Sequence, residues 1–316
     1  MSNMFLGFHN VENISDRPAI SQLEDNIKSF LDYSFLKIGG FINVNIPTSG
    51  LYNGDFAALK SSQDPARPNN TVWESVRKDW VYETGVCHNG RCPTPISGIY
   101  VNNVFVPGPT GLSPNNYSIN YPLGQIVFTS PKPASMNIKL NYSYRYIQTY
   151  TAHECSWWRE LQRLSYDPDA NSKNKGQIIT ANHRVQLPCI IIETIARTSQ
   201  TPYQLGSVDN IIDQDILLHI YTENSSQRDF ISDILLIQKD RESYLYDINK
   251  VIKDNVYKID NKGQINNSGL YYDEIMNNSI YRSNIFVIQN SVLSEMNTIS
   301  STLHNSVIRW TIKIYP

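Results

Sequence analysis

Cysteine and histidine residues form the clearest candidate for chemistry in this sequence. Cys87 and Cys92 flank the stretch His-Asn-Gly-Arg, and His153 and Cys155 follow downstream around Glu154. Three thiolates and one imidazole could hold a tetrahedral zinc ion, so Cys87, Cys92, His153 and Cys155 are candidate ligands. Two alternatives stay open, namely a local disulfide across the Asn-Gly turn and plain thiols. The four-residue gap is longer than the common zinc knuckle, and this favours thiols.

The remaining reactive residue types have ordinary structural explanations. Cys189 lies in the apolar run CIIIETIA and is expected to be a small core residue. His219 alternates within ILLHIYTE, as a core or cross-strand residue does. The chain has no Walker loop, no G-x-G-x-x-G, no G-x-S-x-G and no H-E-x-x-H. We therefore expect no enzyme, and an enzyme built on the four zinc candidates remains an alternative.

Three tyrosines share one face of a predicted strand. Tyr142, Tyr144 and Tyr146 alternate with polar residues in MNIKLNYSYRYI, and this period is typical of a half-buried antiparallel strand. Such a row of rings could stack on sugars or bases, but aromatics on one strand face more often pack into a core or a subunit interface. We take these tyrosines, with Arg228, as candidate interface residues.

The bulk composition excludes several classes of protein. The 316 residues carry a formal net charge of −2, which gives no footprint for sequence readout of nucleic acid. The start lacks a signal-peptide pattern and no run is long enough to span a membrane, so we expect synthesis in the cytoplasm and reduced cysteines. Charged residues make up only 18%, which suits wide permanent contacts between subunits. An AT-rich genome is the alternative source of this bias.

The first half reads as one helix followed by β-hairpins. Residues 21–36 have helical spacing, with Ser21 and Glu24 as a capping box. Residues 73–83 predict a short helix or turn that Trp73 and Trp80 anchor to a core, and residues 154–164 a further short helix. Period-two patterns around Asn102-Asn103 and around the turn at 122–124 predict two hairpins before the tyrosine strand.

The second half reads as a mixed α and β domain. Strands are predicted at 186–196, 211–223, 285–292 and 306–315, and a helix runs from 226 to 237, capped by Ser226 with Asp229. We expect an α+β, β-dominated fold, with an N-terminal helix and hairpin domain over 1–165 and an α/β sandwich-like domain over 183–316. Residues 166–182 are a polar linker between them.

Several segments resemble virion proteins of tailed bacteriophages. YSINYPLGQIVFTSPKPASMNIKLNYSYRYI is similar to a hairpin-and-strand module of that class, and SGIYVNNVFVPG precedes it. RVQLPCIIIETIARTSQTPYQLGS, followed by DILLHIYTENSSQRDFISDILLIQKDRESYLYDI, resembles neck and tail-terminator proteins. LEDNIKSFLDYSFLKIGGFINVNIPTSGLY with WESVRKDWVYETGV resembles virion proteins of marine and cyanobacterial phages with contractile tails.

The resemblance implies a structural subunit located in the virion. It implies a homo-oligomeric, six-fold ring at the head–tail joint, in contact with other neck, tail-tube or sheath proteins and without a cofactor. The long polar loops at 47–72, 165–182 and 253–284 are then expected to become ordered against adjacent subunits. A baseplate or tail-tip module that binds host glycans through an exposed tyrosine ladder is the alternative.

Overall fold

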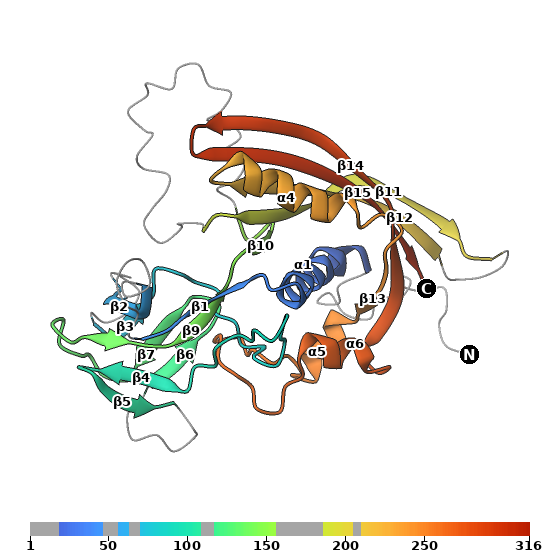
Figure 1. Cartoon of the computed structure of the whole chain (residues 1–316). Helices are drawn as coiled ribbons and strands as arrows, with labels where there is room; N and C mark the ends of the chain where they lie inside the picture. The colour runs from blue at the N-terminus through green and yellow to red at the C-terminus, as the bar shows by residue number, and fades with distance from the viewer. Residues whose placement is uncertain (1–18, 47–55, 63–69, 109–116, 156–185, 205–209) are drawn as a thin grey trace, which may run out of the picture.

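The computed structural model describes residues 19–46, 56–62, 70–108, 117–155, 186–204 and 210–316. They form an upper layer, in which helices cover a six-stranded sheet, and a lower region of shorter strands (Figure 1). The β-dominated α+β fold that the sequence predicts is confirmed. No helix within the described ranges is long and apolar enough to cross a membrane.

The upper sheet contains the longest strands of the chain. Its order is β10-β11-β12-β15-β14-β13, and every pair is antiparallel except β10 with β11. The strands are β10 (Gln148–Thr151), β11 (Cys189–Pro202), β12 (Asn210–Thr222), β13 (Glu242–Tyr246), β14 (Arg282–Ser300) and β15 (Leu303–Tyr315). The strand predicted at 306–315 is confirmed as part of β15, and its alternate residues Ile308, Trp310, Ile312 and Ile314 are all buried.

Two helices cover one face of this sheet. α1 (Ala19–Lys37) and α4 (Ser225–Leu236) bury apolar rows three and four residues apart against the strands. Both helices match their predictions, but both predicted caps are wrong. Ser21 lies inside α1, and Asn224 caps α4 by accepting a hydrogen bond from the Gln227 backbone N–H at 2.8 Å.

The lower region contains two smaller sheets. A seven-stranded sheet has the order β5-β4-β8-β2-β3-β7-β6, and β1 pairs with β9. The strands are β1 (Phe41–Val44), β2 (Ala58–Ser61), β3 (Val72–Glu74), β4 (Gly98–Val101), β5 (Val104–Pro107), β6 (Tyr117–Asn120), β7 (Gln125–Phe128), β8 (Ile138–Lys139) and β9 (Tyr142–Arg145). Both predicted hairpins are confirmed, and the two asparagines of the β4–β5 turn have the positive φ that a tight hairpin turn requires.

Of the short helix or turn predicted over 73–83, the helix does not form. This segment begins as β3 and continues through turns and an isolated bridge between Trp80 and Tyr144. Both tryptophans are nevertheless buried, as expected of anchors. Here the apolar residues that are spaced as in a helix contact two different strands instead. Local periodicity does not distinguish these two arrangements.

The predicted loop over 253–284 has a core of its own. α5 (Ile248–Lys253) and α6 (Tyr272–Asn277) bury Val251, Val256 and Ile275 beside β13. The described chain therefore orders this segment internally, which corrects the expectation that a neighbouring subunit does so. The loop predicted at 165–182, and most of the helix predicted at 154–164, lie outside the described residues. The loop predicted at 47–72 is described only at 56–62 and 70–72, and there the prediction is wrong for residues 58–61, which form β2.

The predicted domain boundary does not separate two cores. α1 comes from the first half of the chain but packs on the upper sheet, and β10 joins that sheet beside β11. The linker predicted at 166–182 lies outside the described residues. Composition marked a polar segment correctly, but it carries no information about which sheet a strand joins.

Candidate assembly surface

The outer part of β14 is an open strand edge. β13 pairs with β14 only between Arg282 and Val287, and one further pair of backbone bonds reaches Ile288. From residue 289 to residue 300, β14 pairs with β15 on one side, and no described strand pairs with it on the other. Its exposed apolar side chains are Val292 (45%), Leu293 (37%), Met296 (45%) and Ile299 (36%).

The open edge is held on a rigid support. The hairpin of β14 and β15 extends over α4 (Figure 1). The Trp310 indole N–H donates to Ser291 Oγ at 3.0 Å, and Ser291 Oγ donates to the Leu235 carbonyl at 3.2 Å. Nearer the tip, Arg228 Nη1 donates to the Asn297 carbonyl at 3.3 Å. These bonds attach the hairpin to α4 at Ser291 and Asn297.

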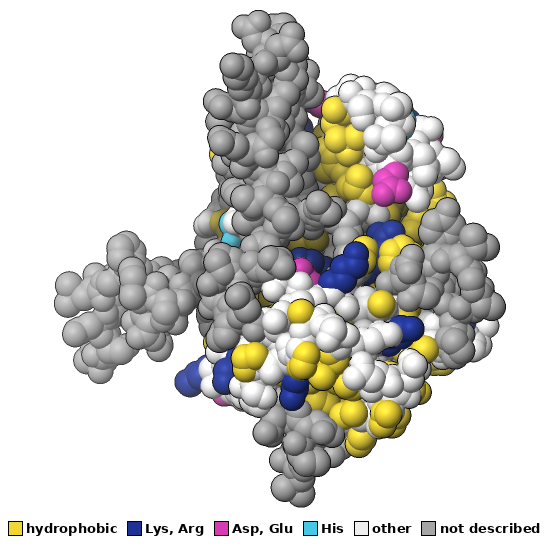
Figure 2. All heavy atoms as spheres, turned by 90° about the vertical axis from the view of Figure 1, so that its left-hand side faces the viewer, with side chains coloured by type: hydrophobic (Ala, Val, Ile, Leu, Met, Phe, Trp, Pro, Cys, Tyr) yellow, Lys and Arg dark blue, Asp and Glu magenta, His cyan; other side chains and the backbone are white. Residues whose placement is uncertain are grey.

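A groove lies beside the same strand. It has a volume of about 850 Å³, and residues of β14 and β15 line it together with Lys239 and Asp240. Its floor includes Arg309, which forms an ion pair with the buried Asp215, and Thr311, which donates to the same carboxylate at 2.7 Å. The face in Figure 2 shows hydrophobic side chains gathered in its upper part and toward its lower end, with several Lys and Arg side chains across its middle and lower parts. An open edge, apolar side chains and a groove together form a surface suited to a protein partner.

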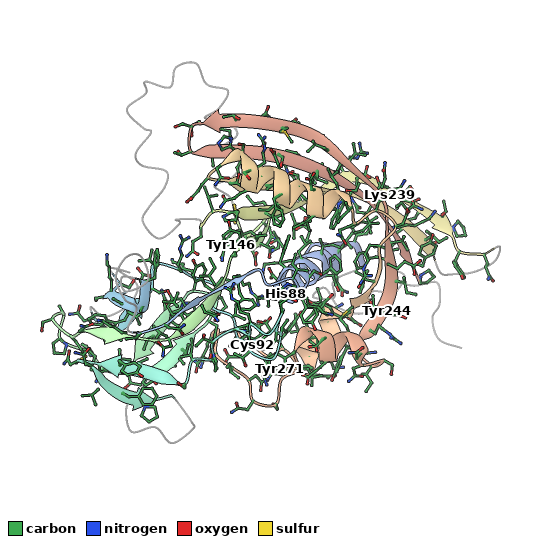
Figure 3. All side chains as sticks on the ribbon, viewed as in Figure 1. His88, Cys92, Tyr146, Lys239, Tyr244 and Tyr271 are labelled. Atoms are coloured by element: carbon green, nitrogen blue, oxygen red, sulfur yellow. A yellow bond between two sulfur atoms is a disulfide. The ribbon has the colours of Figure 1, made fainter. Side chains whose placement is uncertain are left out.

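The tyrosines predicted for an interface lie mostly inside the chain. Tyr142 and Tyr144 are 0% and 6% exposed, and the Tyr142 hydroxyl donates to the Phe56 carbonyl at 2.8 Å. Tyr146 lies where the chain passes to the upper sheet (Figure 3), and its hydroxyl accepts from Gln227 Nε2 at 2.6 Å. Arg228 is also buried. The interface prediction is therefore wrong for Tyr142, Tyr144 and Arg228, and the exposed ladder that motivated glycan binding does not exist.

The four predicted zinc ligands do not come together. Cys87 and Cys92 form a disulfide with each other, which corrects the expectation of reduced thiols. His153 is largely exposed and lies 3.5 Å from Glu24, while Cys155 is buried against Cys189. Within the described ranges, no three His, Cys, Asp or Glu residues are placed to hold a metal. Burial raises the pKa of the Cys189 thiol well above its usual value, so Cys189 is the neutral core residue that its apolar run predicts.

The disulfide closes a loop against the end of α1. His88 Nδ1 lies 3.0 Å from the Lys37 carbonyl, and Arg91 Nη2 donates to the Phe41 carbonyl at 2.7 Å. Gly39 has a φ of +86° and lies under the His88 ring, so a side chain at this position would meet the imidazole. The crosslinked loop therefore fixes the turn between the helix and β1 (Figure 3).

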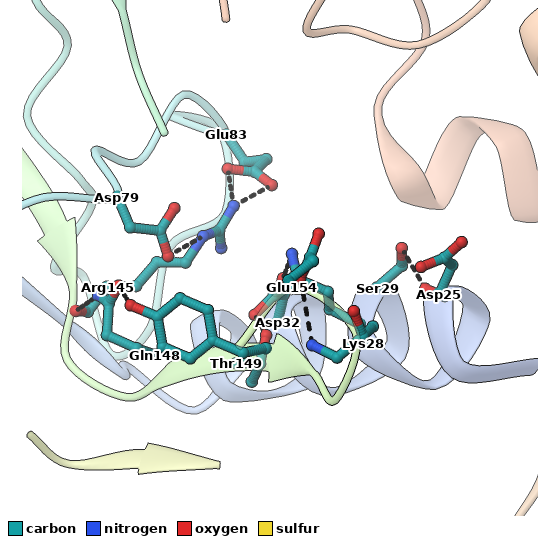
Figure 4. Close-up of polar contacts among 12 residues, drawn as sticks. Asp25, Lys28, Ser29, Asp32, Asp79, Glu83, Arg145, Gln148, Thr149 and Glu154 are labelled. Carbon is teal, nitrogen blue, oxygen red and sulfur yellow. Dashed lines mark hydrogen bonds and ion pairs between the residues drawn. The ribbon is translucent and has the colours of Figure 1, made fainter. Parts of the chain in front are cut away.

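A buried charge cluster joins the two layers. Arg145 at the end of β9 is 5% exposed, and its Nη2 donates to both oxygens of Glu83, at 2.7 and 2.8 Å. Its Nε lies 3.4 Å from Asp79 Oδ2 (Figure 4). Burial raises the pKa of Asp79 to about 6, and the neighbouring Arg145 limits that rise. The sequence pattern had placed Arg145 on the polar face of its strand.

A small polar cavity adjoins the cluster. Its volume is about 140 Å³, and its walls come from α1, β9 and the segment between β13 and β14. The Arg145 guanidinium lies over Tyr82, which stacks on Tyr271, and Lys258 Nζ lies 4.7 Å from the centroid of the Tyr271 ring. This alternation of cations and rings attaches the 253–281 segment to the rest of the chain. Nothing in the local sequence signals it, because its members come from three separate segments, around Tyr82, around Arg145 and within 253–281.

No protein-family model matches the chain, and no curated protein matches it significantly.

Proposed function

We propose that this protein is a structural subunit of a tailed-phage virion that associates with copies of itself, in a ring at the neck or tail end. The observation that carries the proposal is the open edge of β14 between residues 289 and 300, with its four exposed apolar side chains. Proteins that work as monomers protect such edges with short strands, charges or proline, since an open edge recruits other strands.

The composition of the segment supports this proposal. Residues 289–300 contain no proline and no lysine, and Glu295 is their only ionisable residue. A second chain that pairs along this edge would supply hydrogen-bond partners for its backbone and would cover Val292 and Met296. The resemblance to neck and tail-terminator proteins suggests a six-fold ring, with tail-tube or sheath proteins as further partners.

The test is the mass and shape of the purified full-length protein. Light scattering on a sizing column, over a range of concentrations, should give a discrete oligomer, and negative-stain images of that peak should show rings. The variant Val292→Thr with Met296→Gln should shift the peak toward the monomer without changing the circular dichroism spectrum. Ile252→Thr is the matched control, because Ile252 is exposed at 57%, at least as much as Val292 and Met296, but lies on α5.

The outcomes separate the proposal from its alternatives. A discrete ring that the double variant weakens and the control leaves intact supports the structural subunit. A chain that stays monomeric at every concentration contradicts self-association. Selective binding on a glycan array would then favour a receptor-binding module, although the buried tyrosines could not provide its site.

A further inference from the structure

The lower region is more basic than the net charge of the chain suggests. Its described residues 56–62, 70–108 and 117–146 contain seven Lys and Arg residues and three acidic ones, whereas the whole chain has a formal net charge of −2. Two of these acids, Asp79 and Glu83, are the partners of Arg145 in the buried cluster. Outside that cluster, the described residues of the region include six basic residues and one acid, Glu74. Such a charge asymmetry within one chain indicates a polyanionic partner for the basic part.

The seven-stranded sheet has one face in the core and one face that is partly open. Alternate residues of its strands, such as Ile99 and Ile138, are buried in the core of the lower region. The residues between them belong to the opposite face. At the β6 end this opposite face is covered, because Gly263 lies against the side chain of Asn120. At the β5 end it is open, and Phe105 is 45% exposed there.

Two aromatic rings and two lysines share the open part of this face. Phe105 of β5 lies opposite Tyr100 of β4, and Tyr100 lies opposite Lys139 of β8. Lys139 is in turn opposite Ala58 of β2, and Lys60 follows two residues later, so the two lysines are diagonal neighbours about 7–8 Å apart. Phe105 and Lys60 are exposed, and Tyr100 and Lys139 are half-buried. Hydrophobic, Lys and Arg side chains also lie together in the lower part of the view in Figure 2.

The Phe105 ring is held close to the sheet because it lies over a glycine. A Cβ added to Gly98 would be 2.8 Å from Phe105 Cζ, so a side chain at this position would displace the ring. The centroids of the Tyr100 and Phe105 rings are 5.2 Å apart, and their planes are tilted by 58°. Covering Gly98 is a structural role for Phe105, but it occupies only the inner side of the ring. The outer side remains free to stack on a flat partner.

A partner that combines negative charges with flat rings matches this face. Single-stranded nucleic acid has both, because its phosphates follow the backbone and its unpaired bases can stack on aromatic side chains. Duplex DNA presents the phosphates, but its bases are already stacked on one another. The one acid on this face among the described residues, Glu74, lies opposite Lys60 and accepts a hydrogen bond from Gln125 Nε2 at 3.3 Å. Its charge is therefore partly compensated.

We propose that the open face of the seven-stranded sheet binds single-stranded nucleic acid without reading its sequence. Bases stack on Phe105 and Tyr100, and Lys139 and Lys60 hold the phosphates. The net charge of −2 does not oppose this binding, because the excess of acidic residues lies outside the lower region. The proposal goes beyond self-association, since the open edge of β14 belongs to the upper sheet.

Fluorescence anisotropy with the full-length protein tests the proposal. Labelled oligothymidylate and oligouridylate of about 20 nucleotides should both bind, and a DNA duplex of the same length should bind about tenfold more weakly. Phe105→Leu should weaken binding of the single strands about tenfold, whereas Phe105→Tyr, which keeps a ring, should preserve it. The double variant Lys60→Gln with Lys139→Gln should also weaken binding. It should lower the slope of log affinity against log salt by about 1.4, because two phosphate contacts are lost.

Phe230→Leu and Lys253→Gln are the matched controls. Phe230 is an exposed ring on α4 and Lys253 is an exposed lysine on α5, so neither change should alter binding. A chain that binds neither single strand overturns the proposal, and so does binding that the lysine pair does not weaken. Equal affinity for the duplex would show that the rings take no part, which also overturns it. If Phe105→Leu does not fold by circular dichroism, the lysine pair and the duplex comparison decide.

Discussion

Replacing Arg145 by methionine should cost about 3–5 kcal/mol of unfolding free energy, because it leaves a buried carboxylate without its partner. The side chain of Glu83 is only 6% exposed, and its carboxylate accepts two hydrogen bonds from the Arg145 guanidinium. Asp79 loses its nearest cation at the same time. Methionine keeps much of the side-chain volume, so the loss reports mainly on charge rather than on a cavity.

The structure also predicts a partial rescue. In the double variant Arg145→Met with Glu83→Gln, the buried negative charge is absent, and at least half of the lost stability should return. Urea denaturation followed by circular dichroism and tryptophan fluorescence measures both variants. Trp80, which is fully buried and packs on Tyr142 near this cluster, makes the fluorescence sensitive to the region.

The control is Arg282→Met. Arg282 stacks on Tyr244 at the exposed start of β14, and its loss should cost less than about 1 kcal/mol. If Arg145→Met is no more destabilising than this control, solvent screens the cluster and its role in joining the layers is wrong. A double variant that is no more stable than the Arg145→Met single variant would show that the cost does not come from Glu83.

Three further predictions concern the same framework. Reduction of the Cys87–Cys92 disulfide, or its replacement by serines, should lower the unfolding free energy by about 2 kcal/mol, the entropy of closing so short a loop, as measured in urea with and without dithiothreitol. Gly263→Ala should cost about 1–3 kcal/mol in the same assay, because Gly263 has a φ of +74° and an added Cβ would lie 2.4 Å from Asn120 Oδ1. Since the pKa of Asp79 is raised to about 6 in the folded chain, its ionisation should reduce stability as pH rises from about 4 through 6 by up to roughly 3 kcal/mol. This part of the pH dependence should be missing in Asp79→Asn, and an unchanged slope in that variant would show that Asp79 titrates normally.

The elements that the sequence predicts well are those whose partners are generic. Any apolar surface accepts the buried rows of α1 and of β15, so their periodicity alone is sufficient to place them in a core. The β4–β5 turn is equally local, because Asn102 and Asn103 both adopt a positive φ without help from distant residues. Such features depend only on residues that are close to one another in the sequence.

The elements that the sequence predicts poorly depend on particular distant partners. Arg145 alternates as a solvent-facing residue would, but Glu83 lies 62 residues before it in the chain and draws it into the interior. Tyr142 and Tyr144 were correctly grouped on one strand, and only the position of the lower sheet decides that they face this chain's own core rather than a neighbour. The outer half of β14 escaped prediction because its apolar residues Leu293, Met296 and Ile299 are spaced three residues apart and so lack the alternation of a strand.

That irregular outer half is the strongest physical reason to expect a partner. Register shifts interrupt its pairing with β15 after Ile288, Leu293 and Thr298, and such bulges can protect an edge by twisting it away. Here, however, Ser291 and Asn297 hold the strand against α4, so the bulges do not withdraw it. A charged surface would protect it equally well, but the segment carries one carboxylate. Buried charges instead gather around Arg145, away from this edge. The edge is left with backbone N–H and C=O groups with which another strand can form hydrogen bonds.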